Sequence, residues 1–329
     1  MGYLTKFLLL TVLIIAVWLG YVLQGGIPSA FEGNANHLKN KIIPEVLNNV
    51  KSLKNSNKVK KTILMPISNN EFDPSEATYA WKIFTSEYGF EVKFATEDGS
   101  KGKTDMKILK KEGLNFIMNL LFTIFKSPEE VVTTYSEMEN DKNFNHPLKW
   151  SDININDYDG IYIPGGHANG MRPYLNSKVL QGKVTEFWGT DKPIAAICHG
   201  VLVLARSINP KTGKSLLYNR KSTSVSNYLE RLTYSLTSWQ MGDYFRTFDE
   251  LTEDEIVRHM TGINNPVEAA KVNKEKQLFD AGPISLDKGT FENPEAGAFV
   301  VEDGNYLSGR YPGDVCLLAH RFAQKVLKH

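Results

Sequence analysis

The chain has 329 residues, which is enough for one large domain or two ordinary ones with a substantial buried core. Its 38 basic and 37 acidic residues nearly balance, so no strong net field would attract nucleic acid or select acidic substrates. The sequence contains no RNA-binding signature, zinc-finger spacing or glycine-rich phosphate loop, which argues against a nucleic-acid partner. Its two cysteines, Cys198 and Cys316, cannot form a framework of several disulfides.

The first predicted element is an apolar helix at the N-terminus. Residues 7–23, FLLLTVLIIAVWLGYVL, are continuously apolar, and a helix of this length roughly matches a bilayer core of about 30 Å. Trp18 and Tyr21 lie near one end, where interfacial aromatic residues are common. We therefore expect a transmembrane anchor over residues 1–24 and a membrane location. The alternative is a signal peptide that is cleaved before Phe31, which would release a secreted protein.

Residues 25–60 are rich in Asn, Lys, Gly and Ser, as expected of a solvated linker. Strand-like and helix-like segments then alternate through a domain that we assign to residues 61–329. This alternation predicts a mostly parallel sheet covered by helices on both faces. The expected strands are 62–68, 90–99, 158–166, 192–197 and 221–225, with a hairpin within 298–309, and the expected helices are 74–89, 172–189, 200–208 and the C-terminal segment.

Residues 101–150 interrupt this alternation with a segment that reads as helical and partly very apolar. It is too long for a simple connection between two strands, so we expect a helical insertion that forms a cap or an oligomer surface. Its most apolar run, 114–125, has about 12 residues and is therefore too short to span a membrane.

A cysteine lies at a predicted turn from a strand to a helix, in IAAICHGVLVLA. Such a turn would hold the Cys198 side chain above the carboxyl edge of the sheet, where open α/β proteins build their sites. The helix N-terminus that follows favours thiolate over thiol. Taken alone, Cys198 could equally be a buried core residue, which is the interpretation that we prefer for Cys316.

A second loop, IPGGHANG at 163–170, follows another predicted buried strand and should end at the same edge of the sheet. The Gly165-Gly166 turn can direct backbone N–H groups toward a developing oxyanion. A PGG sequence by itself is only a turn. Together with AICHG it favours a catalytic site.

Five segments follow one another in an order shared with a known family: PISNNEFDPSEATYAWKIF, GFEVKFATEDG, DYDGIYIPGGHANGM, KPIAAICHGVLVLA and VVEDGNYLSGRYPGD. In these segments the chain resembles the ThiJ/PfpI family of the class I glutamine-amidotransferase-like superfamily. The resemblance spans about residues 62–327 and is greatest to the branch of heat-shock-type chaperones and glutathione-independent glyoxalases, where helical insertions follow the second strand. It implies a three-layer α/β sandwich of flavodoxin-like type and a homodimer.

The resemblance also implies roles for residues near the cysteine. Cys198 would be the nucleophile, and His199 would be the base, as in relatives with Cys-His in tandem. Glu76 matches the family glutamate that contacts the cysteine sulfur. A protonated Glu76 could hydrogen-bond a thiolate, and an ionised one could move substrate protons. Its alternative role is that of a first-turn acid that stabilises its helix.

The resemblance implies a third acid and an oxyanion site as well. Relatives orient the histidine with an acid roughly thirty residues beyond the cysteine, and Glu230 lies at about that distance, with Asn227 as the alternative. The backbone N–H groups of Gly165, Gly166 and the residue after the cysteine would form the oxyanion site. His167 would line the pocket.

Three functions are consistent with this sequence. The first is a cysteine-dependent, glyoxalase-like conversion of 2-oxoaldehydes to 2-hydroxy acids, with no metal or organic cofactor. The second is an amidase or peptidase that works through an acyl-enzyme. The third is a chaperone or stress sensor in which Cys198 is oxidised. A glutaminase is not expected, because the late histidines, His259, His320 and His329, do not form the His-Xaa-Glu motif that such enzymes use.

Overall fold

The computed structural model describes residues 60–113, 127–283, 285 and 288–329. The predicted anchor at 1–24 and nearly all of the predicted linker at 25–60 therefore lie outside the described residues. In the part of the chain that is described, no helix combines the length and the apolar composition that crossing a bilayer requires.

The described residues form a seven-stranded sheet in the order β5-β3-β1-β6-β7-β9-β8. Neighbouring strands run parallel, except that β8 and β9 pair antiparallel as the predicted hairpin. The mostly parallel α/β sheet predicted from the sequence is thus confirmed. The strands are β1 Thr62–Pro66, β3 Glu91–Thr96, β5 Leu148–Lys149, β6 Gly160–Ile163, β7 Ile194–Ile197, β8 Val300–Asp303 and β9 Tyr306–Gly309.

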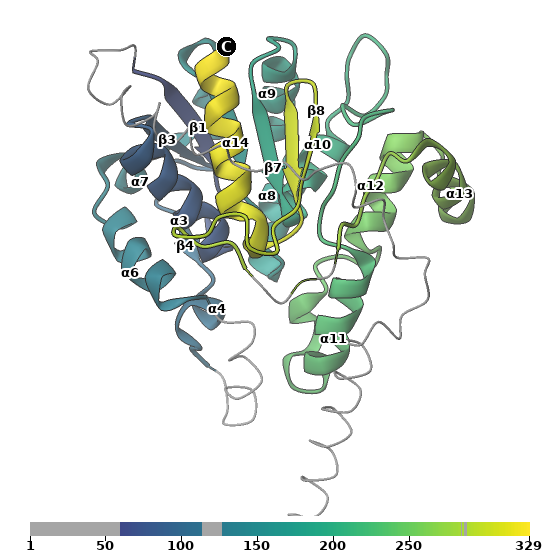
Figure 1. Cartoon of the computed structure of the whole chain (residues 1–329), viewed down its shortest axis with the longest axis horizontal. Helices are drawn as coiled ribbons and strands as arrows, with labels where there is room; N and C mark the ends of the chain where they lie inside the picture. Colours follow the sequence, from purple (N-terminus) through teal and green to yellow (C-terminus); the bar gives the residue numbers. More distant parts are fainter. Residues whose placement is uncertain (1–59, 114–126, 284, 286–287) are drawn as a thin grey trace, which may run out of the picture. The chain divides into compact units, whose positions relative to one another are not determined.

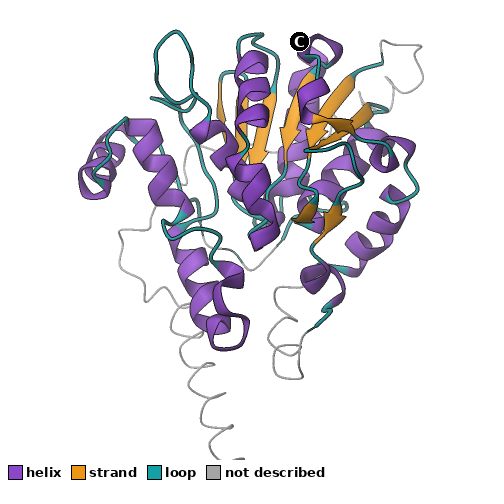
Figure 2. Ribbon diagram, turned by 180° about the vertical axis from the view of Figure 1, so that it is seen from behind, coloured by secondary structure: helices purple, strands orange, loops and turns teal. Residues whose placement is uncertain are grey.

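Helices cover both faces of this sheet, which makes three layers (Figure 1). On one face lie α3 (Pro74–Lys82) and α14 (Val315–Lys328), which contact each other. Figure 2, seen from behind, shows the opposite face, which α8 (Arg172–Asn176), α9 (Lys178–Trp188) and α10 (Val201–Arg206) cover. Because both faces are covered, the central strands are apolar along their whole length rather than alternating.

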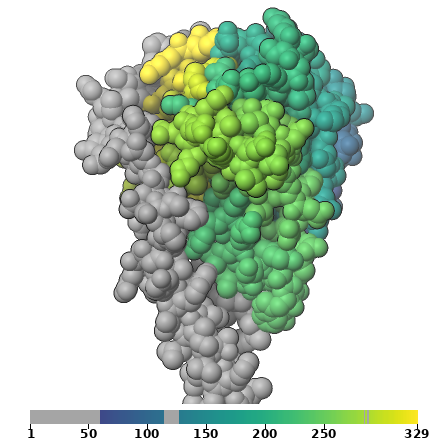
Figure 3. Space-filling model, turned by 90° about the vertical axis from the view of Figure 1, so that its right-hand side faces the viewer, coloured from purple at the N-terminus to yellow at the C-terminus, as the bar shows by residue number. Residues whose placement is uncertain are grey.

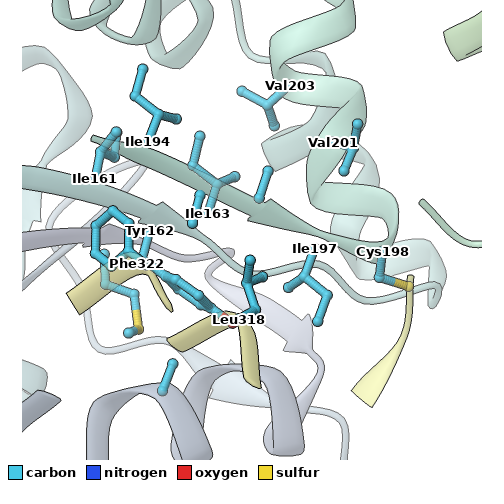
Figure 4. Close-up of a cluster of buried hydrophobic side chains, with 14 of the residues drawn as sticks. Ile161, Tyr162, Ile163, Ile194, Ile197, Cys198, Val201, Val203, Leu318 and Phe322 are labelled. Atoms are coloured by element: carbon cyan, nitrogen blue, oxygen red, sulfur yellow. The ribbon is translucent and has the colours of Figure 1, made fainter. Parts of the chain in front are cut away.

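The core lies between these layers. All residues of β6 and β7 are buried, with sequences GIYI and IAAI. Figure 4 shows their side chains between α10, which contributes Val201 and Val203, and α14, which contributes Leu318 and Phe322. Cys198 directly follows the last residue of β7, at the edge of the sheet where this strand ends (Figure 4).

Within the segment 101–150, for which a helical insertion was expected, the described residues form α4 (Met106–Lys110), α6 (Glu129–Met138) and α7 (Lys142–Asn145). They also form β4 (Lys103–Thr104), which pairs in parallel with β2 (Asn70–Phe72) outside the segment, and β5 of the main sheet. Helix α6 packs on α3 and is joined to it by hydrogen bonds from Tyr79 to Glu130 and from Lys82 to Glu137. Helix α3 therefore lies between the sheet and α6, and residues 74–81 are all buried.

Two expectations differ from the structure in the region after α10. Residues 221–225 were expected to form a strand, but Ser222 makes only an isolated parallel bridge to Phe279. Three further helices, which the sequence analysis did not assign, follow: α11 Asn227–Met241, α12 Thr252–Thr261 and α13 Pro266–Lys276. Figure 3 shows this helical region on the molecular surface, where α13 buries Ala269 and exposes most of its other residues.

Candidate active site

The cysteine lies directly after β7, at the first position of a short 3-10 turn that leads into α10. Its backbone has φ of +56°, a conformation that is uncommon for a residue with a side chain and that indicates a local constraint. In this strand-turn-helix arrangement, the sharp turn places the side chain of a nucleophile above the end of its strand. Cys198 is 6% exposed, so its sulfur lies in an enclosed site at the edge of the sheet.

Two glycines allow the cysteine turn and the PGG loop to touch. A Cβ atom on Gly200 would lie 2.6 Å from the carbonyl oxygen of Ile163 and 2.8 Å from that of Pro164. A Cβ atom on Gly165 would lie 2.8 Å from the Gly200 nitrogen. These separations are shorter than real Cβ contacts, so both positions require glycine. The predicted convergence of the two loops is therefore present in the structure.

Three side chains form a chain of hydrogen bonds from the Cys198 sulfur to Glu230 on α11. The Cys198 sulfur lies 3.3 Å from His199 Nδ1, and His199 Nε2 lies 3.2 Å from Glu230 Oε1. His199 is 2% exposed and Glu230 6% exposed, so water is largely excluded from both contacts. Asn227, the alternative partner expected for His199, instead donates its backbone N–H to Glu253 and its side-chain amide to Asp254.

Glu230 is held in place by the start of a neighbouring helix. It lies in the first turn of α11, and Thr252 at the start of α12 donates its backbone N–H to Glu230 Oε2 at 2.8 Å. The Thr252 hydroxyl lies 3.1 Å from Oε1. Sequence reasoning did not find Thr252, because its contribution is partly a backbone N–H and depends on how α11 and α12 pack.

Glu76 connects α3 to the PGG loop. It is completely buried, and its Oε2 accepts the Gly165 N–H at 2.7 Å. Oε1 is also buried and has no hydrogen-bond partner at ordinary distance among the described residues. Burial, followed by the charge of Asp73, raises the pKa of the Glu76 carboxyl well above its usual value. Glu76 therefore favours the protonated form.

The Cys198 thiol and the Glu76 carboxyl group each change the pKa of the other. Burial raises the pKa of the Cys198 thiol, and negative charges on Glu76 and Asp73 raise it further. The backbone N–H of His199 acts in the opposite direction on the sulfur. Because two adjacent negative charges in a buried site are costly, a thiolate is favoured when Glu76 holds its proton.

The Gly165 N–H is occupied by Glu76, which corrects the expectation that it is free to stabilise an oxyanion. Its carbonyl accepts the Asp73 N–H at 3.1 Å, so both polar backbone groups of Gly165 bond to α3 or its cap. Gly166 has φ of +144°, and a Cβ there would lie 2.9 Å from the Asp73 nitrogen. The PGG loop thus contacts both Asp73 and Glu76 at the start of α3.

His167 packs in an aromatic environment. Its ring stacks on Phe245 with centroids 4.3 Å apart, and it meets the Tyr244 ring edge-on at 4.8 Å. Burial, with the charges of His199 and Lys107, lowers the pKa of His167 to about 3, so the imidazole is neutral. Its buried Nε2 has no hydrogen-bond partner among the described residues. The two aromatic residues follow α11, and no local sequence signal marks them.

Within the described ranges, no group of three or more His, Cys, Asp or Glu side chains is arranged to hold a metal ion. A hollow of about 270 Å³ is present elsewhere on the surface and is lined by residues that include Lys214, Tyr218 and His259. It shares no residue with the Cys198 cluster. The Cys198 cluster itself supplies a buried thiol, an adjacent imidazole and two carboxyl groups.

Comparison with known proteins gives one family. The family model described as ThiJ/PfpI family-like matches residues 67–258, which is more than half of the chain. "Glyoxalase 3" of Candida albicans is 28% identical over 152 residues, covering 46% of this chain and 58% of that protein. "Glutathione-independent glyoxalase HSP31" of Saccharomyces cerevisiae is 26% identical over 158 residues, covering 48% and 60%. The chain thus matches somewhat over half the length of these curated relatives.

Solved structures agree on the fold. Glyoxalase III from Candida albicans superposes with a TM-score of 0.52 at 19% identity, covering 80% of this chain and 97% of that one. Rapid Encystment Protein 24 KDa from Francisella tularensis gives a TM-score of 0.53 at 18% identity, covering 81% and 99%.

Proposed function

Because the chain belongs to the ThiJ/PfpI family, we propose that it is an enzyme that converts 2-oxoaldehydes to 2-hydroxy acids without glutathione, with Cys198 as its nucleophile. The observation that carries this proposal is the hydrogen-bonded line from Cys198 through His199 to Glu230, beside the buried Glu76. The names of the relatives in Candida albicans and Saccharomyces cerevisiae support the same reaction.

The first step is addition of sulfur to the aldehyde carbon. His199 takes the thiol proton as the Cys198 sulfur bonds to that carbon, and the former aldehyde oxygen becomes the hydroxyl of a hemithioacetal when it receives a proton. Glu230 supports the imidazolium that exists between these events, as the carboxylate of a catalytic triad does. The proton therefore travels from sulfur to oxygen through one histidine.

The second step moves hydrogen between two carbons of the substrate. A base removes the proton from the carbon bonded to sulfur, and the electron pair forms an enediol with the neighbouring carbonyl. Return of a proton to that neighbouring carbon leaves a thioester of the 2-hydroxy acid on Cys198. His199 can remove this proton and the protonated Glu76 can return one, because both side chains lie beside the sulfur.

The third step is hydrolysis. Water attacks the thioester carbon, the carbon–sulfur bond breaks, and the thiolate leaves to be reprotonated by His199. The balance is one 2-oxoaldehyde and one water to one 2-hydroxy acid, with no oxidant or reductant. His167 Nε2, which has no hydrogen-bond partner among the described residues, is suited to hydrogen-bond an oxygen of the substrate.

The test is turnover of methylglyoxal by the purified full-length chain in the absence of glutathione. The proposal predicts stoichiometric conversion to lactate. Failure to form lactate, together with cleavage of members of a peptide panel, would replace this function by the second candidate.

That second candidate is hydrolysis of an amide or peptide through an acyl-enzyme, because a Cys-His-Glu line also serves acyl transfer. The occupied Gly165 N–H does not separate the two candidates, since thioester hydrolysis in the first candidate also passes through a tetrahedral oxyanion. An oxidation sensor receives less support, because burial raises the pKa of Cys198 and oxidation favours accessible cysteines of low pKa.

A further inference from the structure

Asp73, Glu76 and Gly165 are joined in a closed ring of hydrogen bonds beneath the sulfur. Asp73 donates its N–H to the Gly165 carbonyl at 3.1 Å, and Gly165 donates its N–H to Glu76 Oε2 at 2.7 Å. Glu76 completes the ring by donating its backbone N–H to Asp73 Oδ1 at 3.0 Å. Asp73 is 5% exposed and Glu76 is completely buried. Two carboxyl groups are therefore enclosed together in the first turn of α3.

The two carboxyl groups differ in how well their environment accepts a negative charge. Asp73 receives two backbone N–H groups, those of Ser75 and Glu76, and lies in the field of Lys288. Glu76 receives one N–H, that of Gly165. Hydrogen bonds to a carboxylate favour its ionised form, so a single charge on the pair is better placed on Asp73.

Other charged and titratable groups face this pair from the surrounding elements. Asp105, at the start of α4, acts on Asp73, and Asp314, at the start of α14, acts on Glu76. The Cys198 thiol faces Glu76 from the strand-helix turn, and the phenol groups of Tyr162 and Tyr174 lie in the field of Glu76. The charge of Asp314 favours a protonated Glu76, whereas the hydrogen bond from the Cys198 thiol lowers the pKa of Glu76 and the charge of Asp105 raises the pKa of Asp73. Burial raises the pKa values of the two phenol groups well above their usual value, so both stay neutral.

We propose that Asp73 is a positioning residue that keeps Glu76 protonated at neutral pH, so that Glu76 presents a hydroxyl rather than a carboxylate to the Cys198 sulfur. The role deepens the proposed function, on which its catalytic significance rests. Burial raises the pKa of Asp73 to about 6, so its charge is present at neutral pH and is lost on acidification. A neutral Glu76 then stabilises the thiolate that attacks the substrate.

A purely structural role for Asp73 makes a different prediction. Asp73 is the N-cap of α3, and Asn and Ser are good N-caps, so Asp73→Asn and Asp73→Ser keep the cap and remove only the charge. If Asp73 served only as a cap, neither variant would change the pH at which Glu76 ionises.

The experiment is an infrared pH titration of the full-length chain that follows the carbonyl stretch of protonated carboxyl groups. The band that is missing in Glu76→Gln belongs to Glu76. In the wild-type protein this band should persist at neutral pH. In Asp73→Asn and Asp73→Ser it should disappear at a pH lower by about one unit or more, because a like charge has been removed.

Asp141→Asn is the matched control, since Asp141 is the N-cap of α7 and bonds two backbone N–H groups in the same way. It should leave the Glu76 band unchanged. A Glu76 band that is absent from the wild type at neutral pH, or that titrates at the same pH in both Asp73 variants as in the wild type, would overturn the proposal. Because the readout is ionisation, it is independent of whether methylglyoxal is the substrate.

Discussion

At the scale of single residues, the decisive feature is that both ring nitrogens of His199 have a partner. Nδ1 faces the sulfur at 3.3 Å and Nε2 faces Glu230 at 3.2 Å, so the acid fixes both the orientation and the tautomer of the ring. The family resemblance suggested Glu230 as the partner, with Asn227 as the alternative, and Glu230 is the residue that lies beside the histidine. Sequence spacing could not predict the Glu76–Gly165 bond, because that contact depends on how two distant loops pack around one carboxyl group.

Replacing Glu230 by Gln should lower kcat for the 2-oxoaldehyde by about 10²- to 10⁴-fold, because the amide no longer supports an imidazolium. Steady-state kinetics measure this effect, and circular dichroism confirms that the fold is kept. Glu253→Gln is a suitable control, since Glu253 lies nearby but binds the Asn227 N–H at 2.8 Å instead of the histidine. Equal activity of the Glu230 variant and the wild type would exclude an orienting role.

At the scale of elements, strands that end at the same edge of the sheet bring the chemistry together. The apolar runs of β6 and β7 predicted both the strands and the loops that follow them, because buried parallel strands have a strong sequence signal. Helices α11 to α13 were not predicted. The surfaces of α11 and α13 are largely polar or half-exposed, so periodicity gives little signal there, and α11 is positioned by its contacts with the following turn and α12. Helix α12 does bury Ile256, Val257 and Met260 at helical spacing, and this signal was missed.

The close approach of the two loops predicts opposite effects of two glycine-to-alanine changes. Gly200→Ala should reduce the free energy of unfolding by about 1–3 kcal/mol, because its Cβ would press on backbone carbonyl groups that cannot move aside. Gly182→Ala should instead increase it by up to about 1 kcal/mol, because Gly182 is exposed within α9 with no neighbouring atom within 4 Å of its Cβ position. Urea denaturation measures both values. An unchanged or raised stability of Gly200→Ala would contradict the packing described here.

At the scale of the whole molecule, buried histidines link folding to pH. His320 on α14 is 2% exposed, its Nδ1 lies 3.1 Å from the Tyr88 hydroxyl, and burial lowers its pKa to about 4 from 6.5. In the unfolded chain this histidine takes up a proton near pH 6.5, whereas the folded protein does so only near pH 4. The unfolded state therefore binds more protons in this interval, and stability falls as the pH is lowered through it.

His320→Gln should remove that contribution. The variant should lose less free energy of unfolding than the wild type between about pH 6.5 and 4, because it has no proton to take up on unfolding at this position. Denaturant titrations at a series of pH values give both slopes. The same slope in the two proteins would show that His320 is not held neutral in the folded state.

If the sulfur of Cys198 performs the reaction, the second cysteine of the chain, Cys316, is its natural control, because it is completely buried in α14. The most direct measurement is lactate formation from methylglyoxal without glutathione by the wild type, Cys198→Ala and Cys316→Ala, side by side. We expect activity to be abolished in Cys198→Ala and retained in Cys316→Ala. Lactate formation that survives the loss of Cys198 would contradict this expectation.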